Sequence, residues 1–309
     1  MYPIQRPSHC EFVPIRHLRY HVRQWGAPQP GRTPWVMVHG WMDVSASFQF
    51  VVDALHALGH DPWIIAPDWR GFGLTAAPDQ DSFWFPDYLA DLDFLLDHHC
   101  PDQAVHLIGH SMGGHVASLY AGARPSRVAR LVNLEGFGMP ATRPSQAPTR
   151  HAQWLDELHQ LHRGELGLRP YSSLEGVAQR LMKTNPRLSR DKADWLAQHW
   201  ARQGDDGQWH VLGEGGHKIV NPNLFHVDET LASYARISAP TLCVVAQDDS
   251  IAQWWKERYS LEEFMQRYAH VPDVQHARLP DCGHMLHHDQ PPALAVLLRD
   301  FLLSAQELA

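Results

Sequence analysis

A serine stands in a glycine-rich segment directly after an apolar run. Residues 104–108 read Ala-Val-His-Leu-Ile, and the next five read Gly-His-Ser-Met-Gly, with the serine at position 111. A buried strand followed by Gly-x-Ser-x-Gly is typical of a sharp strand-to-helix turn that exposes the serine hydroxyl on a strained backbone. Glycines are needed on both sides because a side chain there would collide with the neighbouring strand or helix. The segment predicts that Ser111 is a nucleophile.

A serine hydroxyl is a poor nucleophile until a base accepts its proton, so Ser111 needs an imidazole within hydrogen-bond reach. Among the 23 histidines, His284 is our candidate, because it follows the last strand pattern in a loop that begins at Pro280. His287 and His288 compete for this role, but they begin the next segment, which favours polar or substrate-edge roles.

The elements that must position these residues alternate along the first 136 residues. Strands are predicted at 18–25, 35–38, 63–66, 104–108 and 129–134, and helices at 45–58, 88–99 and 112–123. Short, wholly apolar strands such as 35–38 indicate burial on both faces of a sheet. Alternating strands and helices predict an α/β fold, with a mostly parallel central sheet and helices on both faces.

The pattern changes after Gly136. Residues 137–235 have helical patterns broken by proline-rich connections, and strands resume at 240–246 and 276–279 before a last helix at 292–303. We therefore expect a core made of residues 1–136 and 236–309, with residues 137–235 inserted as a helical cap, or lid.

Four short motifs occur in order, each after a strand pattern. They are His39-Gly40-Trp41, Asp68-Trp69-Arg70-Gly71-Phe72-Gly73, the Gly109–Gly113 segment and Gly283-His284. With them the chain resembles the α/β-hydrolase family, in particular its serine hydrolase and esterase branch with a helical cap. The resemblance covers essentially the whole core. It implies an oxyanion hole formed by the backbone N–H groups of Trp41 and Met112.

The base must be held in one tautomer by a carboxylate, and two positions compete for this role. Asp249 follows the strand 242–246, where the family most often carries its acid, and Asp248 is a weaker neighbour. Glu135 ends the strand 129–134, where certain haloalkane dehalogenases of the family carry theirs. We favour Asp249 and keep Glu135 as the alternative acid.

We expect four residues to contact the substrate, and we expect no metal site. Several of the 12 tryptophans fall in the expected cap. They could line an apolar acyl pocket, but we favour a role in the cap's own core for most of them. The expected substrate-binding residues are Trp41, His110, Trp154 and His217. The pairs at 98–99 and 287–288 suggest no metal site, because adjacent histidines point apart and no carboxylate or thiol completes a set.

Composition excludes several classes of protein. The net charge is 26 − 34 = −8, and no basic stripe indicates nucleic acid or a membrane surface. The four cysteines lack metal or disulfide spacing, and no apolar run resembles a secretory signal or a membrane span. We expect a cytoplasmic monomer or homodimer with reduced thiols and no cofactor.

The expected function is a serine hydrolase that cleaves a carboxylic ester with a small-to-medium, largely apolar acyl group, through an acyl-enzyme. The same triad also serves acyl transfer, thioester hydrolysis and C–C bond hydrolysis, and fold and triad do not choose among them. A non-catalytic small-molecule receptor is the alternative from another class.

Overall fold

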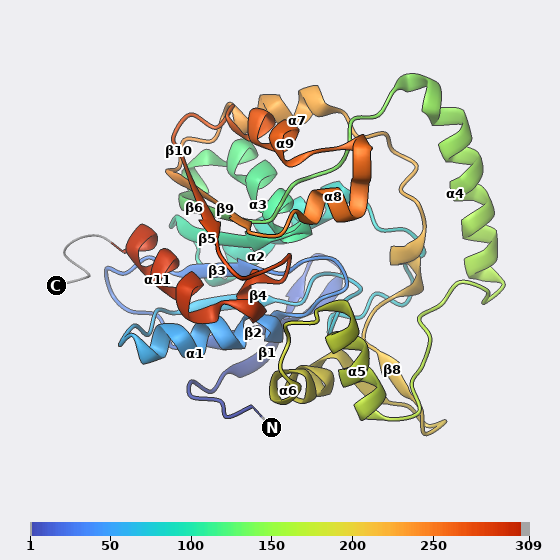
Figure 1. Ribbon diagram of the computed structural model, residues 1–309, viewed down its shortest axis with the longest axis horizontal. Helices are drawn as coiled ribbons and strands as arrows, with labels where there is room; N and C mark the ends of the chain where they lie inside the picture. The colour runs from blue at the N-terminus through green and yellow to red at the C-terminus, as the bar shows by residue number, and fades with distance from the viewer. Residues whose placement is uncertain (1, 304–309) are drawn as a thin grey trace.

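The computed structural model describes residues 2–303, which form an eight-stranded sheet in the order β1-β2-β4-β3-β5-β6-β9-β10 (Figure 1). β2 is antiparallel to both of its neighbours, and the pairs from β4 to β10 are parallel. The mostly parallel sheet predicted from the sequence is confirmed. The strands are β1 His9–Ile15, β2 Leu18–Trp25, β3 Trp35–Val38, β4 Ile64–Pro67, β5 Val105–His110, β6 Val128–Leu134, β9 Thr241–Ala246 and β10 Val274–Leu279.

Burial explains which strands the sequence predicts. Every residue of β3, β4, β5 and β9 is buried, so the sequences of these strands are mostly apolar. β1 is mostly exposed, lies at the edge of the sheet and was not expected from the sequence.

Helices cover both faces of the sheet, as expected (Figure 1). On β3, Trp35 and Met37 belong to one apolar cluster with α1 and α11, whereas Val36 and Val38 belong to another with α2 and α3. This division follows from the alternation of side chains along a strand. The helices of the core are η1 Ser45–Phe48, α1 Gln49–Ala57, α2 Phe85–His99, α3 Met112–Ala123, η2 Pro125–Arg127, α8 Ser250–Trp255, η5 Lys256–Arg258, α9 Leu261–Tyr268, α10 Leu286–Asp289 and α11 Pro291–Leu302.

A long segment between β6 and β9 carries mostly helices. They are η3 Pro144–Gln146, α4 Ala147–His162, α5 Leu174–Thr184, α6 Arg190–Trp200, η4 Gly215–Lys218 and α7 Val227–Tyr234. A short hairpin of β7 (Ala201–Gln203) and β8 (Trp209–Val211), which the sequence did not predict, lies among them. In residues 2–303 we find no helix with the length and apolar character needed to cross a membrane.

Two parts of this inserted segment differ in their packing. α5 and α6 form an apolar cluster that includes Trp195 and reaches Val44 and Phe50 of the core. α4 buries none of its residues and stands apart at the edge of the molecule (Figure 1). The role of Trp195 agrees with the expectation that most tryptophans here build a local core.

Candidate active site

Ser111 lies on a strained turn between β5 and α3. Its backbone has φ 54° and ψ −119°, a conformation that L-residues rarely adopt. The amide of Ser111 donates to the carbonyl of Leu134 at 2.8 Å, and its carbonyl accepts from the amide of His115 at 3.1 Å. These bonds connect the turn to β6 and to the first turn of α3. Strain of this kind is typical of functional sites, where the surrounding structure holds the residue in place.

The flanking glycines are required by close contacts. A Cβ atom on Gly109 would lie 2.3 Å from the carbonyl oxygen of Gly113, and a Cβ on Gly113 would lie 2.3 Å from that of Val38. The structure therefore gives the steric reason for the Gly-x-Ser-x-Gly pattern. Gly109 lets α3 begin directly against β5, and Gly113 lets it begin directly against β3.

His284 lies in the loop between β10 and α10, beside this turn. Its ring centroid is 4.7 Å from the ring of His110, the residue before Ser111. The backbone carbonyl of His284 accepts a hydrogen bond of 2.8 Å from Nε2 of His110. Within residues 2–303, Ser111 and His284 form no hydrogen bond. Catalytic hydrogen bonds are often long or poorly aligned without substrate and tighten only in the complex.

Glu135 is the carboxylate that faces His284. Its Oε2 is 3.3 Å from Nδ1 of His284, and its Oε1 accepts from the amide of Ala246 at 2.6 Å. Glu135 follows β6 directly, has φ 57° and is 2% exposed. The side-chain amide of Asn133 closes this turn, because its Nδ2 donates to the carbonyl of Gly136 and its Oδ1 accepts from the amide of Gly136. A buried carboxylate therefore sits at the end of β6, fixed from both sides.

The two expected acids have different surroundings. Asp249 begins α8 as its N-cap, where its carboxylate accepts from the amide of Ala252 at 2.9 Å, and it is exposed. Asp248 forms an ion pair with Arg187 at 2.7 Å. Both acidic side chains of the β9–α8 loop are thus engaged elsewhere, and the structure pairs His284 with Glu135, the alternative acid.

The two expected oxyanion donors flank Ser111. Met112 is the first residue of α3, and Trp41 follows Gly40, on which a Cβ atom would lie 3.0 Å from Cβ of Ser111. The loop after β3 therefore runs directly against the serine. Among the described residues, the backbone N–H groups of Trp41 and Met112 have no hydrogen-bond acceptor. Free N–H groups beside a nucleophile can stabilise an oxyanion.

The residues expected to bind substrate have different surroundings. His110 is 1% exposed and donates to the carbonyl of His284, so it holds the loop that carries His284. The ring of His217 is stacked between Phe72 and Phe83, at 3.7 Å from each, and burial lowers its pKa to about 3. Trp154 is half-buried on α4, 6.3 Å from the ring of Trp84.

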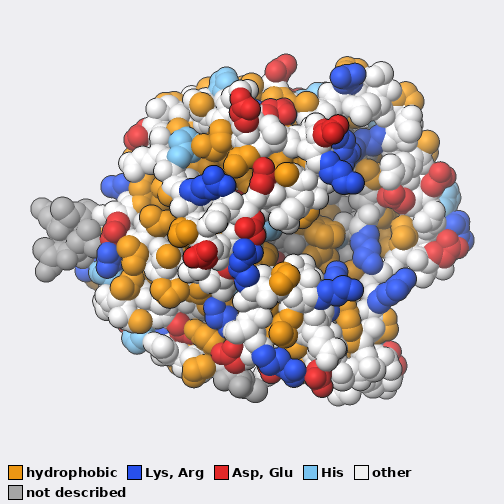
Figure 2. Space-filling view, viewed as in Figure 1, with side chains coloured by type: hydrophobic (Ala, Val, Ile, Leu, Met, Phe, Trp, Pro, Cys, Tyr) orange, Lys and Arg blue, Asp and Glu red, His pale blue; other side chains and the backbone are white. Residues whose placement is uncertain are grey.

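Two exposed tryptophans lie at the site. The ring of Trp254, on α8, meets the ring of His284 edge-on at 4.1 Å and is 46% exposed. Trp41 is 53% exposed, and its Nε1 donates to the carbonyl of His217 at 3.3 Å. Figure 2 shows that the face of the molecule presented in Figure 1 is hollowed near its centre, with hydrophobic side chains inside the hollow and Lys and Arg side chains around it. Trp254 was not expected from the sequence, because none of its neighbours in the chain forms a motif that would indicate contact with His284.

The environment of His284 favours its neutral form. Burial lowers the pKa of His284, and this effect exceeds the opposite effect of the Glu135 carboxylate. A neutral imidazole is the form that can accept a proton from a serine. The structure thus holds the ring in the state that a general base needs.

The Asp68–Gly73 turn supports the loops beneath the site. Asp68 accepts from the amides of Ser45 and Leu74, and it pairs with Nδ1 of His21 at 2.7 Å. Arg70 makes a two-pronged buried ion pair with Asp91 of α2. These contacts join the loops after β3 and β4 to β2 and α2.

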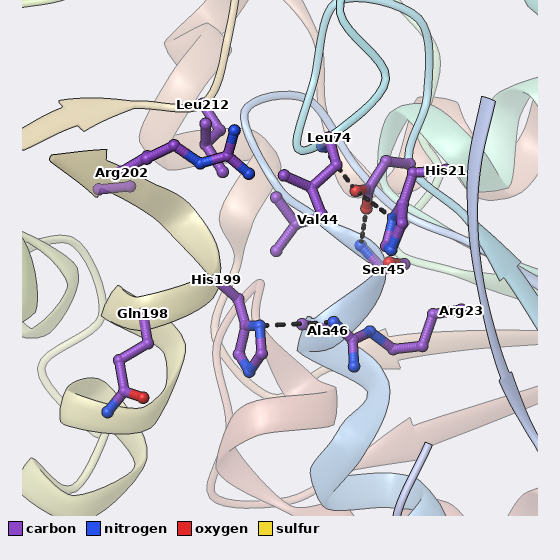
Figure 3. A pocket seen from close by; sticks show the side chains of 12 residues that line it. His21, Arg23, Val44, Ser45, Ala46, Leu74, Gln198, His199, Arg202 and Leu212 are labelled. Carbon is purple, nitrogen blue, oxygen red and sulfur yellow. Dashed lines mark hydrogen bonds and ion pairs between the residues drawn. The ribbon is translucent and has the colours of Figure 1, made fainter. Parts of the chain in front are cut away.

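A cavity of about 110 Å³ adjoins this turn, between β2, the start of η1 and the end of α6 (Figure 3). His21 and Arg23 line it from the core, and His199 and Arg202 line it from the inserted segment. Nη2 of Arg23 and Nδ1 of His199 are 3.4 Å apart across it. Neither Ser111 nor His284 lines this cavity, so it is separate from the serine site.

Comparison with known proteins identifies a family. The alpha/beta hydrolase fold family matches residues 33–291 of the chain. A serine hydrolase-like protein of Danio rerio is 28% identical over 296 residues, which cover 94% of this chain and 86% of the relative. A cis-3-alkyl-4-alkyloxetan-2-one decarboxylase of Shewanella oneidensis is 24% identical over 288 residues, which cover 89% of this chain and 84% of the relative.

Solved structures show the same architecture. The thioesterase domain from the curacin biosynthetic pathway superposes with a TM-score of 0.81 at 22% identity, covering 95% of this chain and 99% of the domain. At this identity the likeness shows the fold and leaves the substrate open.

The His21–Asp68 pair predicts a pH dependence of stability. Burial opposes the charge on His21, but hydrogen bonds to Asp68 and Cys10 raise the pKa of His21 from 6.5 to about 9. The charged imidazole therefore contributes fully below pH ~6.5, and its contribution is lost as the pH rises through ~9. For this buried pair we expect the free energy of unfolding, measured with urea, to fall by about 3 kcal/mol across that window.

The matched control is His21→Gln, in which this loss of stability should be much smaller. An equal fall in the free energy of unfolding in the wild type and in His21→Gln would show that His21 is not the cause. An NMR titration of His21 with its midpoint below 6.5 would contradict its raised pKa.

Proposed function

Because the chain belongs to the α/β-hydrolase fold family, we propose that it is a serine hydrolase in which Ser111 is the nucleophile, His284 the base and Glu135 the acid. The observation that carries this proposal is the contact of His284 with the buried carboxylate of Glu135, while His284 also lies against His110, the residue before Ser111. Glu135 lies 3.3 Å from Nδ1 of His284, which leaves Nε2 as the nitrogen that can serve Ser111.

The proposed reaction begins with attack by Oγ of Ser111 on the carbonyl carbon of an ester. The serine proton passes to Nε2 of His284, and the carbonyl oxygen becomes an oxyanion that accepts from the N–H groups of Trp41 and Met112. Glu135 holds the imidazole in the required tautomer and stabilises its charged form. When the C–O bond breaks, His284 gives the proton to the leaving alcohol.

The second half of the reaction releases the acid. Water attacks the acyl carbon and transfers a proton to Nε2 of His284 as the new tetrahedral intermediate forms. When that intermediate breaks down, the proton passes to Oγ of Ser111 and the carboxylic acid leaves. All proton transfers use the same imidazole, so the mechanism needs no cofactor.

The exposed aromatic side chains at the site support a largely apolar acyl group as substrate. Trp254 presents an exposed ring next to His284, and the exposed Trp41 directly follows Gly40, which lies against Ser111. Exposed apolar surface beside a site usually marks a place where a ligand binds. We propose that the acyl chain covers these rings, with the segment between β6 and β9 as a lid that carries Trp154.

The experiment that tests the nucleophile is covalent labelling with a fluorophosphonate. We expect one label per chain, detected by intact-protein mass spectrometry, because the probe reacts with an activated serine. Ser111→Ala should abolish labelling and ester turnover while the far-ultraviolet circular dichroism stays unchanged. A folded wild-type protein that does not label would favour a non-catalytic receptor instead.

The acid is tested by two conservative substitutions. Glu135→Gln removes the charge that stabilises the imidazolium, and we expect kcat for a p-nitrophenyl ester to fall by about 10⁴-fold. Asp249→Asn is the matched control, because Asn caps a helix as well as Asp does, and kcat should stay nearly unchanged. A severe loss in Asp249→Asn together with a nearly normal Glu135→Gln would reverse the assignment.

The exposed rings of Trp41 and Trp254 predict a preference for esters with longer acyl chains. Each methylene buried against the tryptophans contributes about 0.8 kcal/mol, so kcat/KM should rise about fourfold per methylene over the first few members of a p-nitrophenyl ester series. Trp254→Ala should flatten this rise. Phe94→Ala, which removes an exposed aromatic ring from α2, should not. A kcat/KM that is highest for acetate and falls with length would contradict the apolar acyl pocket.

A further inference from the structure

A group of buried metal-ligating side chains lies behind the serine turn. Asp43, His110 and His287 each offer one ligand atom, and these atoms all lie within 4.8 Å of one another. The side chains come from the β3–η1 loop, the end of β5 and α10. All three residues are at least 97% buried, since their exposed fractions are 3%, 1% and 0%.

Four polar atoms of this group have no hydrogen-bond partner among the described residues. They are Oδ2 of Asp43, Nδ1 of His110, and both ring nitrogens of His287. Leaving a buried polar atom unpaired costs about 1–3 kcal/mol. Such atoms seldom gather in one place unless a ligand or ordered water satisfies them.

The hydrogen bonds already present set the state of His110. Its Nε2 lies 2.8 Å from the carbonyl oxygen of His284. A carbonyl oxygen only accepts, so Nε2 carries a proton and donates it. In the neutral ring, Nδ1 then presents a lone pair to the buried group. A histidine that binds a metal usually donates its other ring N–H to a carbonyl or carboxylate, which is the arrangement seen here.

Asp43 is oriented in a similar way. Its Oδ1 accepts a hydrogen bond from the hydroxyl of Ser47, and its Oδ2, which has no hydrogen bond among the described residues, lies 3.7 Å from Nε2 of His287, an ion pair only when that ring is protonated. Gly40 keeps space open beside the group, because a Cβ atom there would lie 3.2 Å from Nδ1 of His110.

The spacing suits a small transition-metal ion. Zn²⁺ binds imidazole nitrogens and carboxylate oxygens at about 2.0–2.2 Å, so tetrahedral ligand atoms lie about 3.4 Å apart. Atoms now as much as 4.8 Å apart would have to approach by about 1.4 Å. Two nitrogens and one oxygen favour Zn²⁺ or Co²⁺ over Mg²⁺ and Ca²⁺, which prefer oxygen ligands.

We propose that Oδ2 of Asp43, Nδ1 of His110 and one ring nitrogen of His287 bind a divalent transition metal of the Zn²⁺ class, with a fourth position open to water. The ion fixes the tautomer of His110, and His110 in turn holds the backbone of His284. The ion therefore positions the loop of His284 and takes no part in the reaction at Ser111.

The sequence predicts no metal site at the histidine pair 287–288, and the structure shows why it misses this group. Both rings are buried, with centroids 4.2 Å apart, because α10 is a single short turn packed into the core. The carboxylate comes from Asp43, more than 200 residues away in the chain. Sequence spacing alone could not reveal it.

The test uses Co²⁺ as the probe, because tetrahedral Co²⁺ absorbs visible light. The full-length protein is loaded by prolonged incubation and, in parallel, by refolding in Co²⁺, since the ligands are buried. We expect one Co²⁺ per chain after desalting, measured by plasma mass spectrometry, together with tetrahedral absorption bands. Asp43→Asn and His287→Gln should each weaken binding at least about tenfold. His115→Gln is the matched control, a buried histidine outside the group, and should bind as the wild type does.

A variant that fails to fold is replaced by His287→Cys, which retains a ligand and should add a cobalt–thiolate charge-transfer band. The proposal is overturned if no Co²⁺ binds by either route. It is equally overturned if binding persists in both Asp43→Asn and His287→Gln, which would indicate adventitious binding to other histidines, or if His287→Cys binds Co²⁺ without a thiolate band. None of these readouts depends on turnover at Ser111, so the result stands apart from the proposed hydrolase activity.

Discussion

The contact between Oε2 of Glu135 and Nδ1 of His284 is the interaction on which the proposed chemistry depends. At 3.3 Å it is longer than a typical hydrogen bond between nitrogen and oxygen, yet it involves a carboxylate that is 2% exposed and fixed by the amide of Ala246. A buried carboxylate needs such partners, because without them burial strongly disfavours its charge. In the proposed mechanism, this contact leaves Nε2 of His284 as the ring nitrogen that serves Ser111.

The sheet brings the two strained residues together. Ser111 and Glu135 both have positive φ values, 54° and 57°, and each directly follows a parallel strand, β5 or β6. The amide of Ser111 donates to Leu134 on β6, and the amide of Glu135 donates to Val244 on β9. Because parallel strands end at one edge, these bonds hold both side chains at that edge. His284 arrives there from β10, and His110 holds its carbonyl at 2.8 Å.

The sequence predicts the interactions between residues close together in the chain better than those between distant residues. The serine turn follows from local sterics, since Gly109 is needed where α3 meets β5 and Gly113 where α3 meets the end of β3. The choice of acid does not, because β6 and β9 are neighbours and a carboxylate after either strand can approach His284. We propose Glu135 because Asp249 begins α8, whereas the longer side chain of Glu135 reaches from the end of β6 to the amide of Ala246 at the end of β9. The sequence also gives no signal for the edge strand β1, which has no continuous apolar run. It gives none for the contact of Trp254 with His284, because no motif surrounds Trp254.

The most direct measurement of the central claim is proton NMR of the His284 ring in protein labelled with ¹⁵N-histidine. The account predicts that Nδ1 of His284 carries a proton, with a strongly downfield resonance that reports its hydrogen bond to a carboxylate. That resonance should shift upfield or vanish when Glu135 becomes Gln and stay in place when Asp249 becomes Asn. An unprotonated Nδ1, or a resonance that responds to position 249 and ignores position 135, would contradict the account.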